Sequence, residues 1–265
     1  MVCGSGFVPL RATAAEETPE RNLPAGYIIV PSSISPDGHY GVSAYDNTVN
    51  PIPPGWEYAP NRIIDRQADD KIVGAIRAKD ALMHMGHGEI LPCRWSADSS
   101  LLLWEVSGKW CPWALTLLRL HKGKIAWQAN LLLDAQWAIL ERTRRADPEG
   151  YRAAMKENKA GKDNRLASGH SVFPDGFTVA VSTDAAAGRP LTLPIKVTAS
   201  LTANPKGLDP YPERANINAL MEATVEEGGR LCVTSFRMAK KPFPPFARSE
   251  APNPALQRTS LALGR

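Results

Sequence analysis

The 265-residue sequence lacks the features that would place it in several common classes. No run of about 18 apolar residues occurs, so no segment is long and apolar enough for a membrane-spanning helix. The net charge is only +4, which is too small to indicate a nucleic-acid partner. Cysteine occurs four times, at Cys3, Cys93, Cys111 and Cys232, with no C-x-x-C pair and no zinc-ligand spacing. We therefore expect no membrane span, no nucleic acid and no structural zinc site.

Short catalytic motifs are also missing. The sequence has no G-x-S-x-G nucleophile elbow, no phosphate-binding loop and no dinucleotide-binding fingerprint. His84 and His87 form the one close histidine pair, with Cys93 six residues after His87, but Gly86 and Gly88 favour a loop over a helix that would align two metal ligands. We therefore expect no metal and no cofactor, and the sequence assigns no catalytic residue.

A tight turn followed by a strand-like segment occurs three times. Residues 35–38 read S-P-D-G, residues 173–176 read F-P-D-G, and residues 96–99 read the degenerate S-A-D-S. An Asp-Gly pair favours a turn because glycine readily adopts a positive φ. These turns resemble the blade signature of β-propeller proteins of the TolB or WD-repeat kind, which implies an irregular or incomplete propeller-like array. The turns lie further apart than the roughly 40–45 residues of a regular blade. The alternative is a mixed β protein that uses one common turn three times.

Alternating apolar residues predict a mainly β fold built of antiparallel meanders. The clearest region spans 90–133, where four segments are joined by short turns. In its last segment, Ile125, Trp127 and Ala129 alternate with other residues, which is the period of a half-buried strand. Pro194 cannot donate to a ladder and predicts that the strand at 191–202 is an edge strand, at least at the end where this proline lies. Further strands are predicted at 27–34, at 40–45, twice within 61–76, at 168–173, 177–183 and 191–202, and in a hairpin around Gly228-Gly229, with a short helix at 217–223.

Two short helices are predicted between the β segments, at residues 134–160. Trp137 and Leu140 are three residues apart, as on the apolar face of a helix, and Asp134 is a possible N-cap. Asp147 and Pro148 then predict the start of a second helix, because proline is well tolerated at the first helical position. The insert is rich in basic residues with acidic residues interleaved, which is typical of a solvated surface.

Three regions are expected along the chain. Residues 27–239 form a single β-rich domain, and residues 240–265 are a disordered, Pro-rich tail that resembles the ends of bacterial open reading frames. Residues 1–26 are either a disordered N-terminus or the remnant of a signal peptide, with small residues at 12 and 14 before Ala15. We expect a periplasmic or secreted location, with a cytoplasmic location as the alternative.

Tryptophan is the feature that bears most on function. Trp95, Trp104, Trp110 and Trp113 all fall in the predicted meander, where burial in the core is the ordinary outcome. An exposed set would form a binding face for a protein or peptide partner. We expect a non-catalytic binding or scaffold module, with a hydrolase of unrecognised active site as the alternative, and leave the oligomeric state open.

The predicted meander has a consequence for Cys93 and Cys111, which lie on the two segments that flank 101–106. Alternate strands are separated by about twice the 4.8 Å spacing, whereas a disulfide needs Cα atoms within about 7 Å. We expect these two cysteines to stay unbonded to each other even under oxidising conditions. Peptide mapping without reductant checks this, and a Cys93–Cys111 linked peptide would contradict the meander.

Overall fold

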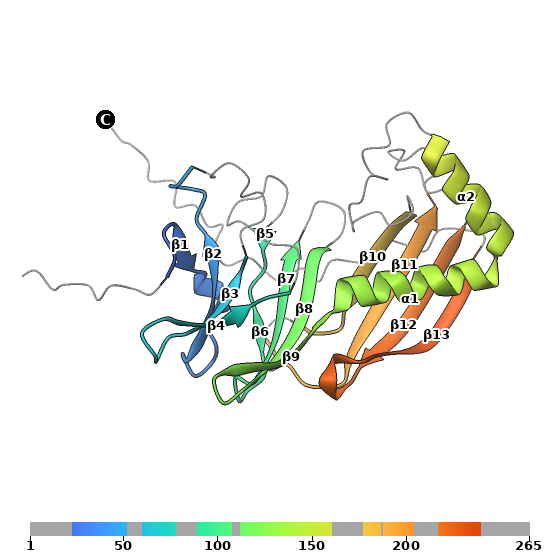
Figure 1. Ribbon diagram of the computed structural model, residues 1–265. Coiled ribbons are helices and arrows are strands. Elements are labelled where there is room, and N and C mark those ends of the chain that lie inside the picture. The colour runs from blue at the N-terminus through green and yellow to red at the C-terminus, as the bar shows by residue number, and fades with distance from the viewer. Residues whose placement is uncertain are drawn as a thin grey trace, which may run out of the picture.

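The computed structural model describes residues 23–51, 60–77, 89–107, 112–160, 177–186, 188–203 and 217–239. In this part of the chain the fold is mainly β, with antiparallel sheets that follow one another along the chain and two α helices between the second and third sheets (Figure 1). The predicted fold class is thereby confirmed. The strand expected at 168–173, the turn at 173–176 and the C-terminal tail lie outside the described residues, as does most of the segment 1–26.

The first sheet has the order β1 (Tyr27–Ile29), β2 (Tyr40–Tyr45), β3 (Arg62–Asp65) and β4 (Lys71–Ala75). The pair of short strands predicted within 61–76 is confirmed as β3 and β4. The strand predicted at 27–34 is too long, because a 3₁₀ turn, Pro31–Ser33, follows β1. Pro31 has no N–H to give to a ladder and sits at the start of this helical turn, where none is needed.

The second sheet is the predicted meander. β5 (Glu89–Ile90) and β6 (Arg94–Trp95) both pair with β7 (Leu101–Ser107), which pairs with β8 (Pro112–His121), and β9 (Lys124–Asn130) follows. The strand order behind the cysteine prediction is therefore confirmed, but the predicted strand at 90–95 is divided into β5 and β6, with Cys93 between them. Cys111 lies outside the described residues. Cys93 is a free thiol, and burial raises its pKa to about 12.

The helix pair begins earlier than predicted. α1 (Leu131–Ala146) continues directly from β9, and the Asn130 side chain accepts a hydrogen bond from the Leu133 N–H at 3.1 Å. Asn130 is thus the N-cap. Asp134 lies within the first turn, where its negative charge interacts favourably with the positive end of the helix dipole. α2 (Pro148–Ala160) starts as predicted, since the Asp147 carboxylate accepts from the Gly150 N–H at 2.9 Å. Within the described residues, neither helix is both long and apolar enough to cross a membrane.

The third sheet has the order β10 (Phe177–Thr183), β11 (Ile195–Ala203), β12 (Asn218–Val225) and β13 (Leu231–Ala239). Two predictions are wrong here. Residues 217–223 were predicted as a helix but form most of β12. This segment is held as a strand because its backbone pairs with β11 on one side and with β13 on the other. β11 is not an edge strand, since it pairs with β10 and β12, and Pro194 precedes its first residue. The hairpin around Gly228-Gly229 is confirmed.

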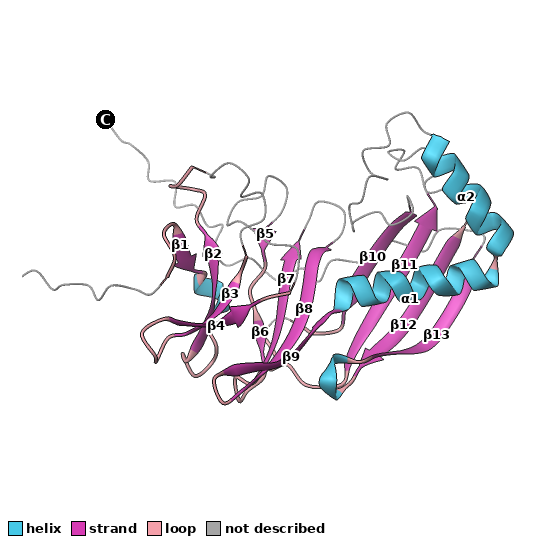
Figure 2. Ribbon diagram, in the orientation of Figure 1, coloured by secondary structure: helices cyan, strands magenta, loops and turns pink. Residues whose placement is uncertain are grey.

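The second sheet lies at the centre of the molecule and is buried on both faces. On one face, Leu102 and Trp104 pack with Val42 and Ile63 of the first sheet. On the other, Leu103 and Leu117 join a larger core that α1 and the third sheet complete. Figure 2 shows α1 and α2 lying on the third-sheet side of the molecule, where α1 crosses β11–β13, and α1 also contacts β8. The α1 helix therefore ties the third sheet to the second.

The first two turns share one hydrogen-bond pattern. The Ser35 hydroxyl donates to the Asp37 carboxylate at 2.6 Å and accepts from the Tyr40 N–H at 2.8 Å. One sheet later, the Ser96 hydroxyl donates to Asp98 at 2.5 Å and accepts from the Leu101 N–H at 2.8 Å. In each case a side chain satisfies the backbone at the start of a buried strand.

The third residue after each of these serines has a positive φ, +71° at Gly38 and +57° at Ser99. Hydrogen bonds from Ser96 and Ser100 lower the pKa of Asp98. Burial acts to raise the pKa of Asp37, but hydrogen bonds from Ser35 and the His39 N–H outweigh it and lower the pKa. Near neutral pH both carboxylates are therefore ionised and accept the hydrogen bonds that stabilise the turns.

We expect Ser35→Ala and Ser96→Ala each to lower the free energy of unfolding by about 1–2 kcal/mol, because each leaves a buried N–H without its acceptor. Urea unfolding measures the change. Ser32→Ala is the matched control, since Ser32 is exposed and its backbone contacts are unaffected. Equal unfolding midpoints for all three variants would show that the serine side chains do not stabilise the turns.

Candidate binding sites

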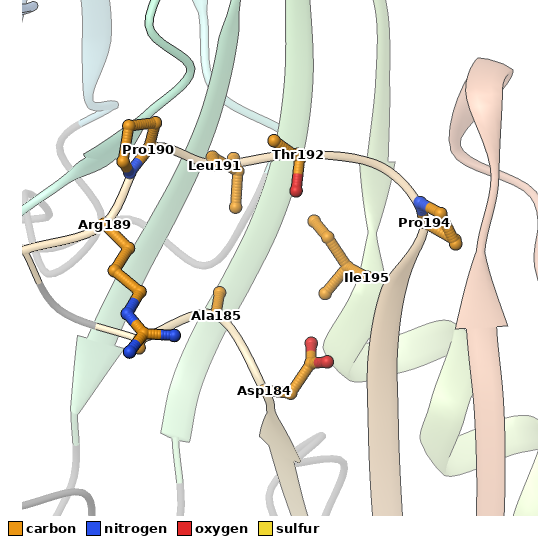
Figure 3. A pocket seen from close by; sticks show the side chains of 9 residues that line it. Asp184, Ala185, Arg189, Pro190, Leu191, Thr192, Pro194 and Ile195 are labelled. Carbon is orange, nitrogen blue, oxygen red and sulfur yellow. The ribbon is translucent and has the colours of Figure 1, made fainter.

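A shallow pocket lies at the connection between β10 and β11 (Figure 3). Its volume is about 160 Å³, below the roughly 300–1,000 Å³ of typical small-molecule sites. Leu191 and Ile195 form its buried side, whereas Asp184 and Arg189 are exposed. In Figure 3 the segment 189–194 forms one side of the pocket, and Asp184 and Ala185 lie on the stretch of chain opposite. The pocket can hold a few water molecules or one small group.

Two hydrogen bonds link the pocket walls to the second sheet. The Leu191 N–H donates to the Trp95 carbonyl at 2.8 Å, and the Arg94 guanidinium donates to the Ala185 carbonyl at 2.8 Å. The same guanidinium forms an ion pair with Glu105 of β7. These contacts explain why the connection takes one shape, and they make it a joint between sheets rather than an open ligand cleft.

The four tryptophans predicted as a binding face take different positions. Trp104 is fully buried between the first and second sheets, and Trp95 is 5% exposed with its ring N–H donating to the Ser33 carbonyl at 2.9 Å. Trp113 is half-buried against the same core. Trp110 lies outside the described residues. The described members of this set therefore pack in the core and form no common solvent-facing surface.

Trp127 joins the second sheet to the third. Its ring N–H donates to Glu227 at 3.1 Å, and the Arg119 guanidinium forms an ion pair with the same carboxylate at 2.8 Å. A Cβ placed on Gly229 would lie 2.7 Å from the Ala129 Cβ and 3.1 Å from the Trp127 ring. Glycine is required there because the hairpin tip packs closely on β9 and its φ is +77°.

Trp137 is the aromatic residue that the sequence placed wrongly. It was predicted on the apolar face of the helix with Leu140, but Trp137 is 64% exposed and Leu140 is 3% exposed. The buried residues of α1, which form its buried face, are Leu131, Leu132, Ala135, Gln136, Ile139, Leu140 and Thr143. Because successive helical residues are 100° apart, Trp137 lies well away from the centre of that face. The helix thus holds a large aromatic ring in solvent.

Charged side chains follow Trp137 along the exposed side of α1. Glu141, one turn further on, forms ion pairs with Arg144 at 2.5 Å and with Arg145 at 2.7 Å. All three side chains are partly or largely exposed, so these pairs contribute little to stability. The exposed side of α1 therefore combines one aromatic ring with a short charged cluster, a composition found at protein-binding hot spots. We call Trp137, Glu141, Arg144 and Arg145 the α1 face.

The histidines form no site in the described part of the chain. His39 lies 3.0 Å from Asp65 and its ring stacks on Tyr40, with ring centroids 4.1 Å apart. His121 is exposed at the end of β8. His84, His87 and His170 lie outside the described residues. Within the ranges that the structure describes, no three His, Cys, Asp or Glu side chains gather as metal ligands would.

The contrast between two tryptophans gives a direct test of their placement. Trp104→Ala should lower the free energy of unfolding by about 3–5 kcal/mol, because it leaves a large cavity between two sheets. Trp137→Ala should change it by no more than about 0.5 kcal/mol, since the ring contacts mainly water. Urea unfolding of both variants measures the difference. A comparable loss in Trp137→Ala would mean that its ring is packed.

Comparison with known proteins adds no relationship to this picture. The chain matches no family model, no curated protein and no solved structure. The function must therefore be argued from the residues themselves, and the α1 face is the exposed feature that ordinary packing does not explain.

Proposed function

We propose that the chain is a non-catalytic binding module that recognises a protein or peptide partner through the α1 face. The observation that carries this proposal is the exposed ring of Trp137 on a helix whose opposite side is buried. Exposure of a tryptophan leaves a large apolar area in water, and a partner that covers it would gain binding free energy. Exposed tryptophan and arginine are the residues most often enriched among interface hot spots.

The scaffold supports such a role. Leu132, Ala135 and Ile139 anchor α1 in the core formed with the second and third sheets. The helix is therefore presented on a packed base instead of a loop, and its exposed side chains keep a defined arrangement. Sites on rigid elements lose less conformational entropy on binding than sites on flexible segments.

The resemblance to propeller blades belongs to the same proposal. In the first and second sheets, the Ser-x-Asp turn comes before the strands β2 and β7, and the two turns touch through a hydrogen bond from the Asp37 N–H to the Ser99 hydroxyl at 3.4 Å. The Cys93 N–H also donates to the Ser32 carbonyl at 3.0 Å, just before those turns. Two turns of the same kind, in contact where the first sheet meets the second, support our proposal of an irregular, incomplete propeller-like array that serves as a scaffold.

A random peptide library displayed on phage tests the proposal with a defined probe. The purified protein should select peptides whose affinity falls by tenfold or more on Trp137→Ala, which equals about 1.4 kcal/mol of binding free energy. Val49→Ala is the matched control, because Val49 is 77% exposed and lies far along the chain from α1. Peptides that bind both variants equally would contradict the α1 face, and turnover of ester or peptide substrates would favour the hydrolase alternative.

A further inference from the structure

β13 is a terminal strand of the third sheet. It pairs with β12 on one side, and no described strand pairs with its other side. Figure 1 shows β13 beyond β12 at the right-hand margin of the sheet. The strand has nine residues, LCVTSFRMA, with no proline, no glycine and one charged side chain, Arg237. A long edge strand of this composition exposes backbone donors and acceptors that another strand can use.

The burial of β13 differs from that of its neighbour. On β12 the core-facing Ala219, Met221 and Ala223 are 0–1% exposed. On β13 the residues that pack against the same core are only partly buried, and these are Leu231, Val233, Phe236 and Met238. The core is thus covered less completely at this margin, and an additional strand beside β13 would shield these four side chains from water.

A β-bulge gives β13 a symmetric pattern. Glu222 of β12 pairs with Ser235 and Ala223 pairs with Val233, so Thr234 is the extra residue. The bulge lets Leu231 and Val233 before it, and Phe236 and Met238 after it, face the same core. Reversing the strand about the midpoint of Thr234 and Ser235 therefore exchanges core-facing residues with core-facing residues.

We propose that a second copy of this chain pairs with β13, strand to strand and antiparallel, about a two-fold axis between Thr234 and Ser235. In this register Val233 lies opposite Phe236 of the other copy, and Leu231 lies opposite Met238. Arg237 lies opposite Cys232, so the one charge of the strand does not face itself. The two third sheets form one continuous sheet, with both α1 helices on the same side. Antiparallel pairs of apolar side chains stabilise such a ladder.

β4, a terminal strand of the first sheet, fits this pairing less well. β4 has five residues, begins at Lys71 and contains Gly74, and its ladder with β3 is irregular. A short strand with a charge and a glycine is a typical protected edge. The pattern of β13 is matched to its own reverse, which favours a second copy over an unrelated strand.

Charge substitutions near the two-fold axis test the proposal. Wild-type protein should sediment as a dimer at micromolar concentration in analytical ultracentrifugation. Thr234→Lys places two like charges beside the axis and should weaken dimerisation at least tenfold, as should Thr234→Glu. Thr234 is exposed and its hydroxyl donates to the Glu222 carbonyl at 3.1 Å, so each substitution removes this one hydrogen bond and leaves the core packing unchanged. Val49→Lys, with the same added charge at a residue that is 77% exposed, should leave the dimer intact.

Mixing the two charged variants separates pairing at β13 from misfolding. An equimolar mixture of Thr234→Lys and Thr234→Glu should recover a one-to-one dimer, because opposite charges then meet across the axis. A wild-type protein that stays monomeric at 100 μM, or a mixture that recovers no dimer after both variants lost it, would overturn the proposal.

Discussion

The burial of the second sheet on both faces is the constraint on which the rest of the molecule depends. β7 carries an almost unbroken apolar run, Leu101 to Trp104, in which alternate side chains enter two different cores. An antiparallel sheet is often solvated on one side, whereas residues 101–104 of β7 are buried on both faces and are all apolar. The first sheet and the α1 helix therefore have fixed partners, since each covers one face of the same strands.

Polar side chains make further contacts where one sheet connects to the next. The hydroxyl oxygens of Ser35 and Ser96 accept hydrogen bonds from the first N–H groups of β2 and β7, where the chain leaves a turn and enters the core. At the far side, Glu227 accepts hydrogen bonds from Trp127 and Arg119 and fixes the hairpin tip of the third sheet on the second. The two serine contacts satisfy buried N–H groups that packing would otherwise leave without partners, whereas the contacts of Glu227 lie at the surface.

The sequence was informative where the pattern was local. Apolar runs between short turns located β7 and β8, period-two alternation located β9, and Asp147-Pro148 located the start of α2, because these signals act within a few residues. The start of α1 was missed because Leu131, Leu132 and Leu133 suit a strand as well as a helix, and the Asn130 cap decides between them. Residues 217–223 were assigned to a helix because their pairing partners lie in β11 and β13, far along the chain. The exposure of Trp137 could not be predicted from the sequence, because it depends on which side of α1 packs against sheets whose strands lie elsewhere along the chain.

Asn130 has two roles at one position, and they join the second sheet mechanically to α1. Its backbone pairs with Thr116 as the last residue of β9, while its side chain caps the helix that begins at the next residue. No flexible linker separates strand from helix, so a swing of α1 about its first turn would have to break the cap or the strand pairing. The direction of β9 therefore fixes the direction of α1, and with it the position of Trp137 on the surface.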